Sequence, residues 1–115
     1  MLGENRRSKR IVRPLNIRFC LSDQNPPKWD LTSIIKDISA GGVKFMAPRD
    51  LKGAKLNLEI KSPRIAPRML KLEAIVLDSR PSGYPSFFDI RAQFLNLSEE
   101  STRDLSILEK EQREK

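Results

Sequence analysis

Apolar and polar residues alternate with a period of two along much of this chain, which is the pattern of β-strands with one buried face. Residues 14–22 begin this pattern, because Leu15, Ile17, Phe19 and Leu21 fall on one face. Later stretches repeat it with Leu56, Leu58 and Ile60, and with Phe88, Ile90, Ala92 and Phe94. Together with intervening β-rich runs, the pattern predicts six strands, at residues 14–22, 29–39, 42–47, 54–61, 69–79 and 87–97.

The last part of the chain has the pattern of a helix instead. Ser98 suits the N-cap, and the acidic Glu99 and Glu100 follow in the first turn, where the helix dipole favours them. Leu105 and Leu108 lie on one side of such a helix. Six short strands separated by turn residues and followed by one helix predict a mainly β fold, a small antiparallel barrel with a helical appendage.

Composition narrows the chemistry available to the chain. Its 115 residues, 38% of them apolar, suit a single compact domain. The sequence has no histidine and one cysteine, Cys20, which excludes most zinc sites, Ser–His and Cys–His nucleophile pairs, and an intrachain disulfide. We therefore predict no catalytic residues, no metal site and no cofactor, and an enzyme is the least favoured class.

The charge distribution favours an anionic partner. The formal net charge is +7, and residues 1–20 carry six Lys or Arg against one acid, whereas residues 98–115 carry four against six. Basic regions of this kind attract nucleotides, nucleic acid, membrane surfaces or acidic protein faces. The N-terminus has no apolar signal-peptide region, and no run approaches the ~18 apolar residues of a membrane span. We therefore expect a cytoplasmic protein without a membrane span.

The stretch ENRRSKRIVR contains two arginines, Arg6 and Arg10, four positions apart. This spacing keeps them on one side of either an extended chain or a helix. Two guanidinium groups on one side can grip phosphate oxygens in a bidentate manner or stack on a base. The alternative is a solvated, disordered basic terminus.

The stretch DISAGG, residues 37–42, places polar groups and a tight turn between two predicted strands. If the chain is extended there, Asp37 and Ser39 project from the same face. A carboxylate matches the adjacent N1–H and N2–H₂ donors of a guanine edge. Gly42 can adopt a positive φ and lets a ligand approach the backbone. The alternative is a local bulged or Asx-type hairpin turn, in which Asp37 bonds nearby amides.

Together these two motifs resemble those of the PilZ domain family, bacterial receptors for cyclic di-GMP. Arg-x-x-x-Arg, at Arg6 and Arg10, precedes the first predicted strand, and Asp-x-Ser-x-x-Gly, at Asp37, Ser39 and Gly42, follows the second. The resemblance extends over nearly the whole chain, through RIVRPLNIRF, DISAGGVKF, LEAIVLDS and FDIRAQFLNLSEESTRDL.

The resemblance implies a six-stranded PilZ-type β-barrel, residues 14–115, whose C-terminal helix covers about residues 98–111. It also implies that a flexible basic arm, residues 1–13, wraps cyclic di-GMP against the outside of the barrel. Signalling would then require an unidentified effector protein, and the receptor is expected to be a monomer or a weak dimer.

The resemblance also assigns roles to the motif residues. Arg6 and Arg10 are expected to contact phosphates and guanine faces, and Asp37 and Ser39 to read a guanine edge, while Gly42 keeps the turn open. One departure is Arg91, because many members of the family have a glycine three residues before the phenylalanine that stands here at Phe94. Candidates of second rank for ligand binding are Arg7, Lys9, Arg13, Gly41 and Arg91.

Two further functions remain open at this point. A degenerate PilZ-type adaptor would bind only protein, since the presence of a motif does not guarantee affinity. A small basic barrel could also bind single-stranded nucleic acid. The second of these is less favoured, because most phenylalanines fall on predicted core positions rather than forming stacking platforms.

Overall fold

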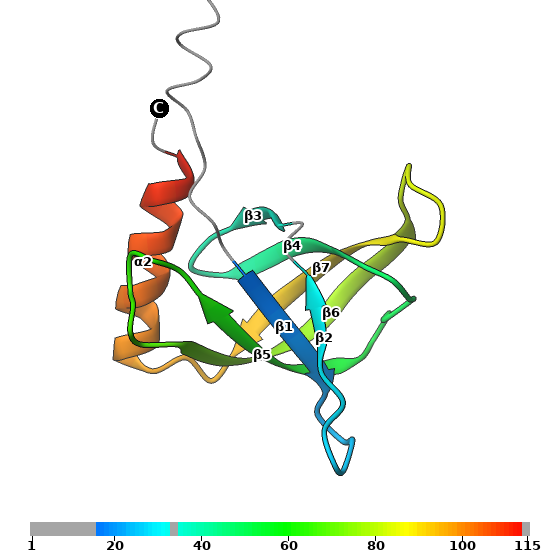
Figure 1. The fold of residues 1–115 in the computed structure, drawn as a ribbon, viewed down its shortest axis with the longest axis horizontal. Helices are drawn as coiled ribbons and strands as arrows, with labels where there is room; N and C mark the ends of the chain where they lie inside the picture. The colour runs from blue at the N-terminus through cyan, green and yellow to red at the C-terminus, as the bar shows by residue number, and fades with distance from the viewer. Residues whose placement is uncertain (1–15, 33–34, 114–115) are drawn as a thin grey trace, which may run out of the picture.

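The computed structural model describes residues 16–32 and 35–113, which form one curled antiparallel sheet and one helix (Figure 1). The prediction of a mainly β fold with a C-terminal helix is confirmed. The strands are β1 (Asn16–Leu21), β2 (Asp30–Thr32), β3 (Ile35–Ile38), β4 (Gly42–Ala47), β5 (Lys55–Lys61), β6 (Leu70–Pro81) and β7 (Phe88–Leu95), and the helix is α2 (Glu99–Arg113).

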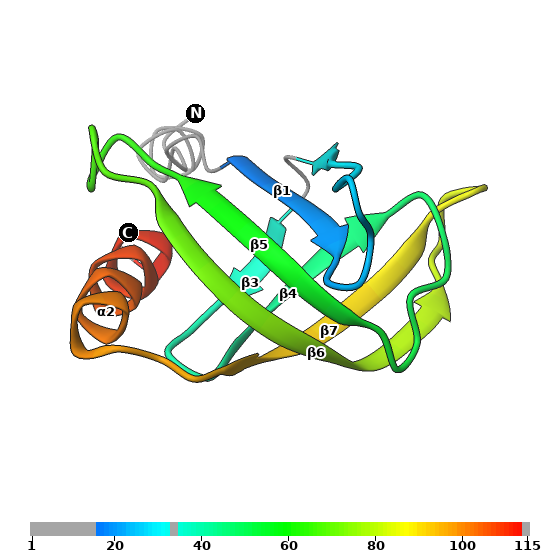
Figure 2. The same ribbon diagram turned by 90° about the horizontal axis from the view of Figure 1, so that it is seen from below.

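The described residues form seven strands rather than the six predicted, because the expected strand 29–39 is divided. Its first part, β2, pairs with β1, and its second part, β3, pairs with β4. The order across the sheet is β2-β1-β5-β6-β7-β4-β3, so the two parts occupy opposite edges although only two residues separate them in sequence. β2 also lies against β4, so the sheet curls into a half-open barrel (Figures 1 and 2).

Alternating side chains fill the inside of this barrel, as the sequence pattern predicts. On β5, the predicted inward residues are almost completely buried, whereas Lys55 and Lys61 at its ends are exposed. Phe19 and Phe45 meet in the middle, with ring centroids 5.4 Å apart and planes tilted by 48°, a separation typical of favourable aromatic pairs.

Helix α2 packs on the barrel through Leu105 and Leu108, which have no exposed surface. The predicted N-cap forms, because the Ser101 N–H donates to Ser98 Oγ at 3.0 Å. Farther along α2, Asp104 accepts a 2.6 Å hydrogen bond from Arg68 in the β5–β6 connection, and this bond raises the pKa of Arg68. The helix is therefore fixed to the barrel at its buried face and at the loop beside it.

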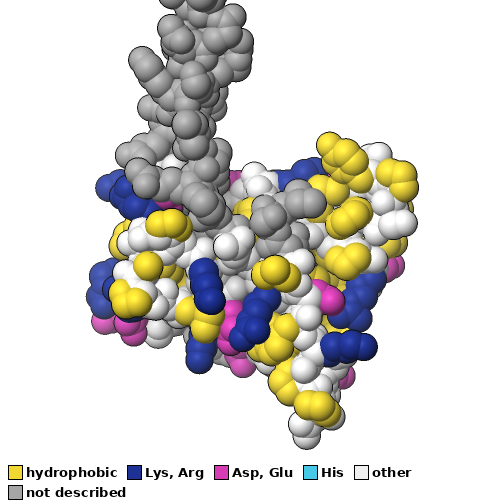
Figure 3. All heavy atoms as spheres, viewed as in Figure 1, with side chains coloured by type: hydrophobic (Ala, Val, Ile, Leu, Met, Phe, Trp, Pro, Cys, Tyr) yellow, Lys and Arg dark blue, Asp and Glu magenta, His cyan; other side chains and the backbone are white. Residues whose placement is uncertain are grey.

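The β6–β7 hairpin projects from the opposite side of the molecule (Figure 1). Hydrophobic side chains gather on this projection in the space-filling view (Figure 3), and Tyr84 at its tip is 67% exposed. The turn itself is held by local hydrogen bonds, since the Ser82 hydroxyl both accepts from the Tyr84 N–H and donates to the Tyr84 carbonyl, each at 3.0 Å.

Candidate functional site

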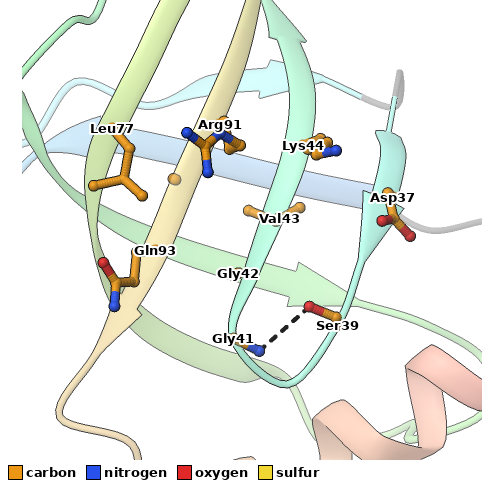
Figure 4. Close-up of a pocket in the computed structure, with 10 residues that line it drawn as sticks. Asp37, Ser39, Gly41, Gly42, Val43, Lys44, Leu77, Arg91 and Gln93 are labelled. Atoms are coloured by element: carbon orange, nitrogen blue, oxygen red, sulfur yellow. Dashed lines mark hydrogen bonds between the residues drawn. The ribbon is translucent and has the colours of Figure 1, made fainter.

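A pocket of about 400 Å³ lies on the outer face of the sheet, where β3, β4, β7 and β6 run side by side (Figure 4). Strand alternation brings Asp37, Lys44, Arg91 and Gln93, the exposed residues of their strands, to this surface. The pocket contains one carboxylate, two cationic side chains and an exposed leucine. Its lining residues are Asp37, Ser39, Gly41, Gly42, Val43, Lys44, Leu77, Arg91, Ala92 and Gln93.

The turn between β3 and β4 forms one end of the pocket. The Ser39 N–H donates to the Gly42 carbonyl at 2.9 Å, and the Gly41 N–H donates to Ser39 Oγ at 3.3 Å. Ser39 therefore stabilises the turn locally, as the turn alternative proposed. Asp37 lines the pocket, and no hydrogen bond joins its carboxylate to another residue in the described ranges.

Gly42 is needed at its position by close packing rather than by an unusual backbone conformation. A Cβ atom there would lie 2.3 Å from the carbonyl oxygen of Ala92 on β7, and its φ is outside the left-handed region. The interpretation that Gly42 uses a positive φ is therefore wrong. Gly41 has open space around it, but its carbonyl accepts a 3.0 Å hydrogen bond from the Phe94 N–H. Both glycines thus bring the turn against β7.

Two β-bulges flank the pocket. The register of β3 shifts between Ile35 and Asp37, and the register of β6 shifts between Val76 and Asp78. Bulges re-aim side chains and are frequent beside functional sites. The first bulge sets Asp37 on the outer face while Ile35 and Ile38 keep inward positions opposite β4. The second leaves Leu77 45% exposed at the pocket wall.

Charged residues form a row across the four strands. Asp37 pairs with Lys44, Lys44 pairs with Arg91, and Arg91 pairs with Asp78 in the registers of adjacent strands. Figure 4 shows Asp37, Lys44 and Arg91 in this order across β3, β4 and β7. Asp78 instead forms an ion pair with Arg80 at 2.8 Å. Within the described part of the chain, neither Lys44 nor Arg91 has an acidic partner within 4.0 Å.

The C-terminal helix reaches the same turn. The Ala40 N–H, between Ser39 and Gly41, donates to Glu109 Oε1 of α2 at 3.3 Å. The turn is therefore held from two sides, by β7 at Gly41 and by α2 at Ala40. A ligand that contacts Ser39 would lie one residue from this helix contact.

The structure brings five of the predicted site residues into one pocket: Asp37, Ser39, Gly41, Gly42 and Arg91. Sequence reasoning did not single out Lys44, Leu77 and Gln93, although strand alternation places Lys44 outward two positions after Gly42. Leu77 depends on a bulge that has no clear signal in the sequence. The remaining candidates lie outside the described residues, namely Arg6, Arg7, Lys9, Arg10 and Arg13.

No group of three or more His, Cys, Asp or Glu side chains in the residues that the structure describes could hold a metal ion. No described helix is both long and apolar enough to cross a membrane.

The sequence was also compared with known proteins. No curated protein gave a significant match. The model of the PilZ domain family, in contrast, matches residues 4–109. This match covers most of the chain, including both motifs and the strands that line the pocket. The chain therefore belongs to the PilZ domain family, whose members include receptors and adaptors for cyclic di-GMP.

Proposed function

We propose that this protein is a non-enzymatic receptor that binds cyclic di-GMP on the outer face of its barrel and signals to a partner protein. The observation that supports this proposal most directly is the position of Asp37. Its carboxylate lies in a pocket with Ser39 and two cationic side chains, and it has no hydrogen-bond partner among the described residues. A surface carboxylate in this position is available to accept donors from a ligand.

Each part of the ligand has a complementary group. The two oxygens of Asp37 accept the N1–H and N2–H₂ donors of a guanine edge. Among the described residues, the Ser39 hydroxyl accepts from the Gly41 N–H at 3.3 Å and donates to none, so its proton is available for a ligand. Gly41 adds no side chain to the mouth of the pocket, and a Cβ there would meet open space.

The basic arm, residues 1–13, supplies the second half of the site in this proposal. Arg6 and Arg10 contact the phosphates and stack on the guanine faces, which planar guanidinium groups do better than lysine. Closure of the arm over the ligand changes the surface offered to a partner. Since cyclic di-GMP is an intracellular second messenger, this role requires a cytoplasmic protein.

Isothermal titration calorimetry with cyclic di-GMP tests the proposal and gives the stoichiometry. We expect binding in the micromolar range or tighter, and a loss of about tenfold or more for Arg10→Ala and for Asp37→Ala, since hydrogen bonds to charged groups contribute about 1.5–3 kcal/mol. Arg64→Ala is the matched control, because Arg64 is an exposed arginine outside this pocket. Absence of binding by the wild-type protein would instead favour an adaptor that binds only protein.

A further inference from the structure

Lys44 and Arg91 form a like-charge pair on the pocket floor. They are direct register partners on adjacent antiparallel strands, and both are exposed. The Cβ atoms of such partners are about 4.5–5.5 Å apart, and like charges in this arrangement destabilise a sheet. Two cations side by side on one face of the pocket create a local positive charge that attracts an anion.

The neighbouring acids do not relieve this repulsion through ion pairs. Asp78, the register partner of Arg91 on β6, is paired with Arg80. Asp89, also on β7, is paired with Lys36 at 3.1 Å. Asp37 is the register partner of Lys44, but no ion pair joins them. Among the described residues, neither cation is therefore held in an ion pair, and both can contact a ligand in the pocket.

We infer that Lys44 and Arg91 together bind a phosphate group of the ligand from the barrel side. This inference rests on the proposed cyclic di-GMP function and adds to it an anion subsite that does not depend on the arm. Arg91 can hold two phosphate oxygens with its planar fork, and Lys44 adds a compact charge from the adjacent strand. Repulsion between the cations in the free protein becomes attraction to a shared anion in the complex.

The surroundings of the pair suit a nucleotide. Asp37 lies on the next strand beyond Lys44, so a base edge at Asp37 and a phosphate over the pair can belong to one ligand (Figure 4). Leu77 lies on the other side of Arg91 and offers an apolar surface for a ribose or base. The bulges at Asp37 and Leu77 align the carboxylate, the two cations and the apolar side chain in one row.

The test compares Lys44→Gln and Arg91→Gln with the wild-type protein in calorimetric titrations with cyclic di-GMP. Each variant should lose about tenfold or more in affinity, as expected for a lost charge-assisted contact. The matched control is Lys55→Gln, which removes the same charge from an exposed strand position outside the pocket. The control should change affinity by less than about twofold.

Stability of the free protein provides a second readout that a structural role would not reproduce. Loss of either charge removes the Lys44–Arg91 repulsion together with the attraction to the acid on the other neighbouring strand, so the midpoint of thermal unfolding without ligand should change by less than about 2 °C. A residue that merely supports the fold would instead lower the midpoint when replaced. A loss of affinity with an almost unchanged unfolding midpoint therefore identifies a binding pair.

Outcomes separate this inference from the proposed function. If the wild-type protein binds cyclic di-GMP and both variants bind equally well, the phosphate subsite is wrong while the receptor function stands. If the wild-type protein does not bind, the receptor function fails, and inorganic pyrophosphate at matched ionic strength becomes the probe. A pyrophosphate-induced rise in the unfolding midpoint that Lys44→Gln and Arg91→Gln abolish would then support the anion site. If pyrophosphate raises the unfolding midpoint equally in the wild-type protein and both variants, or raises it in none of them, the anion site is wrong.

Discussion

The contact between Gly42 and β7 makes a specific prediction about stability. A Cβ at position 42 would lie 2.3 Å from the Ala92 carbonyl oxygen, and a backbone atom cannot move aside as a flexible side chain could. Gly42→Ala should therefore lower the free energy of unfolding by about 1–3 kcal/mol, the usual cost of overpacking. Urea denaturation measures this difference.

Gly41→Ala is the matched control for that substitution. A Cβ at Gly41 meets nothing within 4 Å, and its φ is not in the left-handed region. We expect a change within about 0.5 kcal/mol, as for most surface substitutions. Equal destabilisation by the two alanines would show that the turn, rather than the approach of β7, determines the requirement for glycine.

Asp50, in the β4–β5 connection, gives a prediction about pH. Hydrogen bonds from the Ser79 hydroxyl and the Lys52 N–H lower the pKa of its carboxyl below the ordinary value of 3.8. The ionised form is thus favoured in the folded state, so the stabilisation is complete above pH 3.8 and is lost as the pH falls through the lowered pKa. Asp50→Asn should be less stable than wild type near pH 6, and the difference should shrink below pH 3.8 in thermal unfolding. A difference that is constant with pH would contradict this origin.

Individual site residues were predictable from sequence only where their role is local. Asp37 and Ser39 were identified because strand alternation sets them on one face, and both line the pocket. The reason for Gly42 was missed because it lies in Ala92, fifty residues later in the sequence. Lys44 was missed for a similar reason, since its significance depends on having Arg91 opposite it.

At the level of elements, the N-cap of α2 is a local feature with a measurable contribution. Ser98 Oγ accepts from the Ser101 N–H at 3.0 Å. Ser98→Ala should lower the free energy of unfolding by about 0.5–2 kcal/mol, because a donor at the helix start loses its partner. Chemical denaturation followed by circular dichroism measures the change.

The control for the cap is the same substitution inside the helix. Ser106 is exposed in α2, and alanine is the better helix former, so Ser106→Ala should be neutral or stabilise by a few tenths of a kcal/mol. A loss of stability at Ser106 as large as that at Ser98 would mean that capping is not the cause.

Strand boundaries were less predictable than the helix for a physical reason. The helix start depends on residues within one turn, and Ser98, Glu99 and Glu100 suffice to mark it. The stretch 29–39 has uniform β character, but its two halves pair with different strands at opposite edges of the sheet. Closure of the barrel determines the point at which this stretch divides into β2 and β3. The local sequence pattern does not indicate that point.

At the scale of the whole molecule, the core of the described residues joins the first strand to the C-terminal helix. The buried cluster extends from Ile17 on β1 to Leu108 on α2, and the same helix contacts the pocket turn through Glu109. The barrel therefore provides a stable frame in which one turn connects the ligand pocket, β7 and the C-terminal helix. Stability and binding should then depend on different parts of the chain.

Removal of residues 1–13 tests this separation. The shortened protein keeps every residue of the described core, so we expect it to unfold cooperatively, with a midpoint within a few degrees of the unshortened chain. Its affinity for cyclic di-GMP should fall by about 100-fold or more, because two arginine contacts of about 1.5–3 kcal/mol each are lost. Calorimetry and thermal unfolding of the same samples give both quantities.

An exchange of Arg10 with Val12 controls for charge, because it retains the composition of the arm but leaves no two arginines in it four positions apart. If the two arginines act as a positioned pair, this variant should lose most of the affinity lost by truncation. Retained affinity would mean that the arm acts only through its overall charge, whose effect should then weaken steeply with added salt. Tight binding by the truncated protein would show that the pocket alone holds the ligand, and the arm would have no part in the site.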